Sequence, residues 1–299
     1  MDRARESGLR YHGCMVPLQR SGRGVLLALA LILACYALAR ILEVVPSSVP
    51  RMAIVALDVL SAMAFALVDG ARTCGLRIVL VFTAICIVVG NIVENIGVAS
   101  GFPYGRYYFV ELMGPKLFHV PILLGLAYIG MAWVSWNVAS LIFSQVNTTG
   151  PRLLAVSALA SVIMTAWDLA QDPVWATALH GWVWRDGGPW FGVPISNYLG
   201  WLGTVFCIYA LFAFFLRRRG TSGLKGSPYA VLFYAVCALG NVLQTLALGS
   251  SGLVADPTGR LWRVADITRA SAFVSIFVMG SFVVLAWLRK LQLAVAAAD

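Results

Sequence analysis

The chain has 299 residues, of which 60% are hydrophobic and only 12% are charged, and its mean hydropathy is +0.84. A water-soluble domain carries about a quarter charged residues, so this composition excludes a large soluble domain and predicts a polytopic membrane protein. The net charge of +9 does not indicate nucleic-acid binding, because the basic residues lie between apolar runs. That placement is typical of membrane topology.

Eight apolar segments approach the roughly 20 residues that a membrane-spanning helix needs. We therefore expect an all-α, polytopic transmembrane helix bundle, in which residues 24–290 form a single transmembrane domain. Residues 1–23 would be a basic cytoplasmic segment and residues 291–299 a C-terminal tail. The basic N-terminus resembles a signal peptide, but no small-residue cleavage site follows the long first run, so we expect that span to be retained. The predicted spans cover residues 24–42, 52–68, 76–97, 120–144, 152–172, 194–216, 229–250 and 267–288.

The distribution of lysine and arginine predicts the orientation. With the N-terminus in the cytoplasm, most of the 22 basic residues fall on inner segments, and Arg217-Arg218-Arg219 is the firmest anchor. This topology predicts a multi-pass cell-membrane protein with both termini in the cytoplasm. It also places the two polar, aromatic connections, 98–119 and 173–193, on the same outer side. Polar groups of six helices would then meet in one half of the bilayer: Asp58, Glu94, Asp168, Asp172, Asn197, Asn241, Gln244, Asp266 and Arg269.

Two aspartates lie four residues apart inside the fifth predicted span. Asp168 and Asp172 follow the uncharged run 153–164, and an i, i+4 spacing puts both carboxylates on one face of a helix. An intramembrane acid is by default a functional candidate. One interpretation is a catalytic acid pair in which burial and the partner's charge keep one carboxyl protonated. The alternative is a structural salt bridge to Arg106, Arg185 or Arg269.

A third acid, Glu94, lies near the outer end of the third predicted span, beside Asn91 and Asn95. Burial would favour its protonated form, so Glu94 is a catalytic candidate that could hold a water or share a proton. The asparagines are candidates for substrate binding, or for structural hydrogen bonds between helices.

The outer loops supply aromatic and basic candidates. Glycine and proline forbid a regular helix over 101–109, which contains Tyr104 and Arg106. Such a loop could cap a cavity at membrane depth. The indoles of the segment 167–190 could line a channel for a long planar lipid or stabilise a cation, although an interfacial aromatic belt has the same composition. The candidate substrate-binding residues are Asn91, Asn95, Tyr104, Arg106, Trp167, Trp175, Asn197 and Tyr198.

Other chemistries lack their sequence signatures. The six cysteines are scattered without a CxxC pair, and the three histidines show no metal-binding spacing. No nucleotide-binding glycine motif occurs. An aspartate pair can hold Mg²⁺ with a diphosphate, but no DDxxD motif and no basic cluster accompany this pair. We therefore expect no metal and no cofactor.

Several segments resemble one known family. They are similar to the CruF-type carotenoid biosynthesis membrane proteins, which are carotenoid 1',2'-hydratases of bacteria and archaea. The resemblance covers about residues 75–205 in motifs and the whole chain in hydropathy. It implies a membrane enzyme that hydrates a terminal isoprenoid double bond without a redox cofactor. The similar segments are 94–98, 101–108, 114–118, 167–173 and 191–201.

The resemblance and the acid residues together predict a cofactor-independent carotenoid hydratase, a hydro-lyase of carotenoid biosynthesis. Its partners would be a lycopene-like carotenoid, water and membrane lipid, with no nucleic acid. Hydration needs a protonated acid, a group that holds water and cation-tolerant walls, which Asp168, Asp172, Glu94 and the aromatic residues would supply. Two other hypotheses stay open: a non-catalytic carotenoid or lipid binding and transport protein, and a membrane prenyltransferase.

Overall fold

A computed structural model of the chain describes residues 22–144, 150–219, 226–248 and 252–296. Its helices are α1 (Arg23–Leu42), α2 (Arg51–Cys74), α3 (Leu76–Ser100), α4 (Ile122–Ile142), α5 (Gly150–Pro173), α6 (Ile195–Arg218), α7 (Pro228–Leu248), α8 (Val264–Val274) and α9 (Gly280–Val295). Short π-helical turns, η2 (Val174–Ala178) and η3 (Ser275–Met279), extend α5 and join α8 to α9.

The described residues form eight helices that are long and apolar enough to cross a membrane, which confirms the all-α multi-pass bundle. The eighth span is the continuous run 264–295, longer than expected. The second also exceeds its prediction, because α2 continues through Asp69, whose carboxylate is fully buried. Most of the predicted N-terminal segment, residues 1–21, lies outside the described residues, as do residues 297–299 of the predicted tail.

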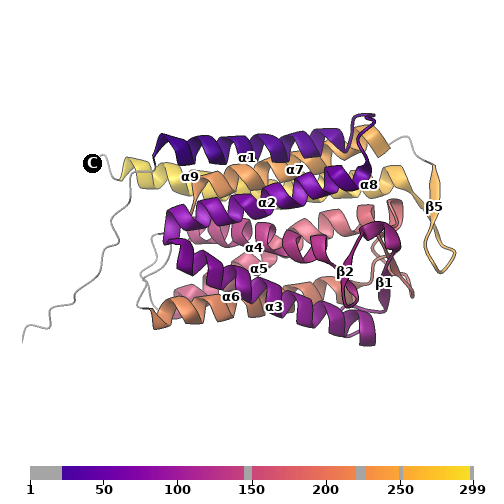
Figure 1. Ribbon diagram of the computed structural model, residues 1–299. Helices are drawn as coiled ribbons and strands as arrows, with labels where there is room; N and C mark the ends of the chain where they lie inside the picture. The colour runs from indigo at the N-terminus through magenta and orange to yellow at the C-terminus, as the bar shows by residue number, and fades with distance from the viewer. Residues whose placement is uncertain (1–21, 145–149, 220–225, 249–251, 297–299) are drawn as a thin grey trace, which may run out of the picture.

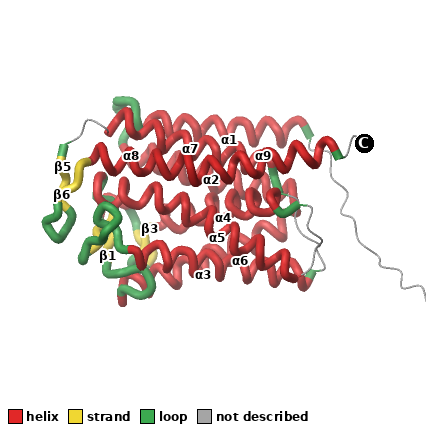
Figure 2. The backbone as a smooth tube through the Cα atoms, turned by 180° about the vertical axis from the view of Figure 1, so that it is seen from behind, coloured by secondary structure: helices red, strands yellow, loops and turns green. Residues whose placement is uncertain are grey.

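Helix α4 occupies the centre of the bundle. It packs against α2, α3, α5, α7 and α9, and every residue from Tyr128 to Leu141 is buried. In both views α4 and α5 lie between a layer containing α1, α2, α7, α8 and α9 and a layer containing α3 and α6 (Figure 1, Figure 2). Helix α5 packs on α4 and α6, so its acid residues lie inside the protein rather than against lipid.

The connections at one end of the bundle carry short strands. They are β1 (Tyr107–Phe109), β2 (Lys116–Leu117), β3 (Val120–Pro121), β4 (Trp182–Trp184), β5 (Leu253–Ala255) and β6 (Leu261–Arg263), with the 3₁₀ turn η1 (Glu111–Met113). Strand β1 pairs antiparallel with β4, so that Tyr107 lies opposite Trp184. The connections 98–119 and 173–193 therefore share one end of the molecule, as the topology predicted.

The ring of Tyr104, in the connection 98–119, packs as a wedge between helices α3 and α6. An added Cβ at Gly97 of α3 would lie 2.6 Å from the ring, and one at Gly200 of α6 would lie 2.7 Å from it. Only glycine allows this approach from both sides. The Tyr104 hydroxyl completes the fit with a 3.0 Å hydrogen bond to Thr204 on α6, which fixes the loop that leads into β1.

Candidate active site

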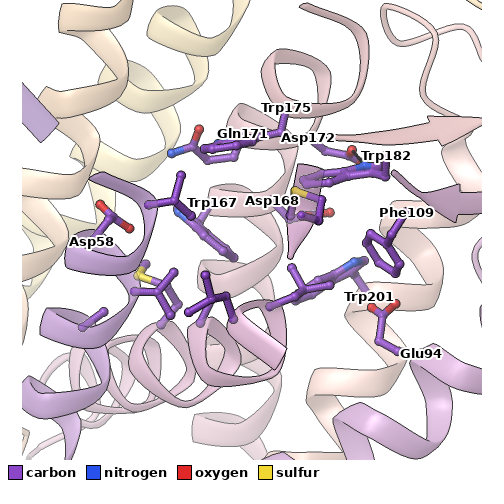
Figure 3. Close-up of a pocket in the computed structure, with 18 of the residues that line it drawn as sticks. Asp58, Glu94, Phe109, Trp167, Asp168, Gln171, Asp172, Trp175, Trp182 and Trp201 are labelled. Atoms are coloured by element: carbon purple, nitrogen blue, oxygen red, sulfur yellow. Dashed lines mark hydrogen bonds between the residues drawn. The ribbon is translucent and has the colours of Figure 1, made fainter. Parts of the chain in front are cut away.

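A cavity of about 1070 Å³, including its open part, lies beneath the paired loops. Residues of all six helices from α1 to α6 line it, and Tyr107, Phe109, Trp182 and Trp184 cover it from the loops. The close-up shows acids at its two sides, with Trp167 between Asp58 and Asp168 (Figure 3). The walls are mostly apolar, so the few polar groups determine its chemistry.

Asp168 and Asp172 both line the cavity but have unequal hydrogen-bond environments. Asp172 accepts three N–H donors: Trp182 at 2.6 Å, Trp184 at 3.3 Å and Asn197 at 2.6 Å. Asp168 accepts only from the same Asn197 nitrogen, at 3.1 Å. No arginine or lysine forms an ion pair with either carboxylate among the described residues, so the salt-bridge alternative has no support there.

Glu94 lines the same cavity from α3. It is 3% exposed, and its two carboxylate oxygens accept hydrogen bonds from the phenols of Tyr107 and Tyr128. Burial and then the negative charge of Glu94 raise the pKa of the Tyr107 hydroxyl. Tyr107 therefore keeps its proton and remains a donor, which suits a carboxylate acceptor.

Aromatic rings form the walls around the acids. Trp201 stacks on Tyr128 at 4.5 Å between centroids, and the ring of Trp167 meets Trp201 edge to face at 6.4 Å. Trp175 lies parallel to Trp182 at 6.4 Å. Trp167, Trp175, Trp182 and Trp201 line the cavity, and the π face of an indole attracts cations.

A second polar cluster lines the cavity: Arg40 of α1, Glu43 directly after α1, and Asp58 of α2. The Arg40 guanidinium lies 2.8 Å from Glu43 and 3.7 Å from Asp58. Sequence analysis noted Asp58 but missed Arg40 and Glu43, because an arginine near a predicted span end is usually an interfacial anchor.

Three of the eight predicted substrate-binding residues, Trp167, Trp175 and Asn197, line this cavity. The other five are not among its lining residues. Their hydrogen bonds explain this: the amide of Asn95 bonds to Asn91 and to the backbone of His119, and Tyr104 is the wedge described above.

Arg106 and Tyr198 do not line the cavity either. Arg106 is exposed and pairs with Asp186 on the loop surface, with a 2.8 Å bond from its Nε; this hydrogen bond lowers the pKa of Asp186. Tyr198 is buried, and its hydroxyl has no hydrogen-bond partner in the described part of the chain.

Tyr128 and Tyr107 are functional candidates that sequence analysis missed. A buried phenol inside an apolar run such as 122–134 needs a hydrogen-bond partner, and this requirement could have pointed to Tyr128 from the sequence. Its partner could not be identified, since Glu94 lies on another helix.

The described residues contain no group of three or more His, Cys, Asp or Glu side chains placed to hold a metal ion. What the site contains is two acids with different partners, a third acid held by phenols, and aromatic walls. This arrangement can move a proton onto an apolar ligand and tolerate the positive charge that results.

Comparisons with known proteins identify the family. A model of the family described as carotenoid biosynthesis protein matches residues 51–255, which include every acid of the cavity except Glu43. The chain belongs to this carotenoid biosynthesis protein family. It is also 32% identical over 130 residues to bisanhydrobacterioruberin hydratase of Haloarcula japonica. That match covers 43% of this family member and 42% of the relative, so it spans less than half the relative's length. No solved structure matches the chain.

Proposed function

We propose that this protein is a carotenoid hydratase that adds water across the terminal 1',2' double bond of an acyclic or monocyclic carotenoid. The observation that carries the proposal is the acid pair with unequal partners in an apolar, aromatic cavity. Membership of the family and the hydratase activity in the relative's name support it.

The hydrogen bonds of the pair suggest a division of roles. Three N–H donors suit a carboxylate at Asp172, because a carboxylate only accepts. Asp168 has one shared donor, which leaves room for the O–H that a carboxylic acid carries. Asp168 is thus the proposed proton donor, and Asp172 the proposed carboxylate that balances the charge.

In the proposed reaction, the π electrons of the alkene form a C–H bond with the proton of Asp168. The less substituted carbon takes the proton, and the other carbon becomes a tertiary cation. A water oxygen then donates a lone pair to form the C–O bond, and its surplus proton returns to the Asp168 carboxylate. The sum is alkene plus water giving a tertiary alcohol, with the acid regenerated and no electron transfer to any redox partner.

Glu94 and the rings would act on the cation. Glu94 contributes negative charge near the acid pair, and Trp167 and Trp201 present ring faces. Glu94 could also hold the attacking water or share the proton with the pair. The substrate would be lycopene-like and would enter from membrane lipid, with the paired loops on the outer side and both termini in the cytoplasm.

Expression in lycopene-accumulating cells, followed by mass analysis of the pigments, tests the proposal. A gain of one water per modified end supports the hydratase. Unchanged pigment that co-purifies with the protein would instead indicate a binding or transport protein, and added prenyl units would indicate a prenyltransferase.

A further inference from the structure

The cluster of Arg40, Glu43 and Asp58 has no role in the reaction proposed above, although it lines the same cavity. Charged groups inside a membrane span are rare and usually functional. The cluster could be a structural ion-pair network between α1 and α2, or it could bind part of the ligand. A structural network would give every charged group a hydrogen-bond partner, so atoms without partners favour ligand binding.

Arg40 is only 3% exposed and has two good partners. One terminal nitrogen bonds to Glu43 at 2.8 Å, and the other bonds to Asn241 of α7 at 2.8 Å. These contacts match one arginine with one carboxylate and leave Asp58 as an extra negative charge.

Asp58 is the unsatisfied member of the cluster. Its side chain is 21% exposed and lines the cavity. Arg40 forms an ion pair with it at 3.7 Å, which is beyond hydrogen-bond distance, and Oδ1 has no hydrogen-bond partner among the described residues. A carboxylate in apolar surroundings is costly without a donor.

The amide of Gln171 faces the same cluster and has a determined orientation. Arg40 can only donate, so Asn241 must present its oxygen to it. Gln171 must then offer its NH₂ group to that oxygen, at 2.8 Å. Its own Oε1 has no partner among the described residues. The cluster thus holds two acceptors without a donor, Asp58 Oδ1 and Gln171 Oε1, and one donor without an acceptor, Arg40 Nε, in the part of the chain that the structure describes.

We propose that Asp58, positioned by Arg40, is the acceptor of a subsite for an O–H group. The O–H belongs to an alcohol on the ligand's end group or to a water held beside it. The chemistry is the same in both cases, since each supplies one donor to the Asp58 carboxylate. The proposal rests on the proposed function only in placing the ligand's alkene near Asp168.

The test measures binding of two short ligands to the purified full-length protein by quenching of tryptophan fluorescence. One is sulcatol, an alcohol with a trisubstituted terminal alkene, and the other is the hydrocarbon of the same carbon skeleton. Each ligand is compared between wild type and Asp58→Leu, so that its partition into detergent cancels. Val59→Ala, at a neighbouring apolar position of the cavity wall, is the matched control.

If the O–H belongs to an alcohol, Asp58→Leu weakens sulcatol binding by about tenfold to a hundredfold, as expected for a lost hydrogen bond to a charged group. Binding of the hydrocarbon changes less than about twofold, and Val59→Ala affects both ligands alike. If the O–H belongs to water, both ligands bind normally but the variant hydrates lycopene about tenfold more slowly with normal pigment retention.

A folded Asp58→Leu protein with unchanged binding and unchanged hydration would overturn the subsite. Asp58→Asn keeps the shape of the side chain and serves if the leucine variant does not fold. Loss of folded protein in both variants would also overturn the subsite, in favour of a structural ion pair. The binding test needs no turnover, so it separates the two proposals. If the wild-type protein hydrates nothing but Asp58→Leu still weakens sulcatol binding, the hydratase proposal is rejected and the subsite is kept.

Discussion

The indole N–H of Trp182 lies 2.6 Å from Oδ1 of Asp172. This bond connects the loop that contains β4 to an acid inside a membrane span. The position of the loop therefore affects the charge of the acid, because moving the loop removes a hydrogen-bond donor from a buried carboxylate.

Trp182→Phe should therefore lower hydration while leaving the protein folded. The expected loss is about tenfold, since a hydrogen bond to a charged group contributes about 1.5–3 kcal/mol. Trp262→Phe is the control, because Trp262 donates its indole N–H to the loop carboxylate of Asp256 at 2.9 Å and does not line the cavity. Rates from cells making lycopene provide the measurement, and equal rates in the two variants would remove this bond from the mechanism.

Asp168→Asn and Asp172→Asn should each nearly abolish hydration. An amide keeps the shape but cannot transfer the proton, and general acid–base catalysis contributes about 10² to 10⁴ in rate. Pigment mass analysis measures turnover, and size-exclusion chromatography checks folding. Asp186→Asn is the control, since that carboxylate is exposed on the loop surface. Near-normal turnover in both acid variants would exclude the pair from the reaction.

Glu94→Gln should lower turnover more than it lowers pigment binding. The substitution removes a negative charge that the proposed cation needs but preserves an oxygen for one phenol. Retained lycopene, measured by absorbance of the purified protein, reports binding separately from hydration. The exposed Glu111 offers Glu111→Gln as a control. A parallel fall in both quantities would point to a structural role for Glu94.

Chelator treatment of the purified enzyme should leave hydration unchanged, and added nicotinamide cofactor should have no effect. The proposed steps need only an acid, a carboxylate and water. Activity lost to chelator and restored by Mg²⁺ would contradict this expectation and would favour a prenyltransferase.

Gly200→Ala should destabilise the protein, whereas Gly203→Ala on the same helix should not. A methyl group at position 200 would meet the Tyr104 ring at 2.7 Å, but nothing lies within 4 Å of one at position 203. Overpacking costs about 1–3 kcal/mol, and alanine is about 0.5–1 kcal/mol better than glycine inside a helix. Thermal unfolding in detergent compares the two, and similar melting temperatures would show that the wedge is loose.

The sequence predicted the helical class and the meeting of the connections 98–119 and 173–193 at one end of the bundle, since hydropathy and basic residues carry both signals. It also selected Asp168, Asp172 and Glu94, whose carboxyl groups stand out in apolar runs. Their roles remain proposals. The binding candidates were predicted less well, because Tyr104 and Arg106 carry polar atoms that the fold satisfies elsewhere.

The partners of the acids depend on tertiary contacts that no local pattern encodes. Tyr128 reaches Glu94 from a different helix, and Arg40 meets Asn241 across 201 positions of sequence. An interhelical contact of this kind follows from how helices pack, and a single sequence gives no direct measure of that packing.

The central position of α4 also has a consequence for biogenesis. It is the most buried of the eight spans found among the described residues. Its polar and indole side chains, among them Trp133, Ser135, Trp136 and Asn137, are all buried. These side chains gain their packing partners only when the neighbouring helices are present. Helices α1 to α3 are synthesised before α4, and α4 also packs on α5, α7 and α9. The bundle can therefore close only after these later helices have entered the membrane.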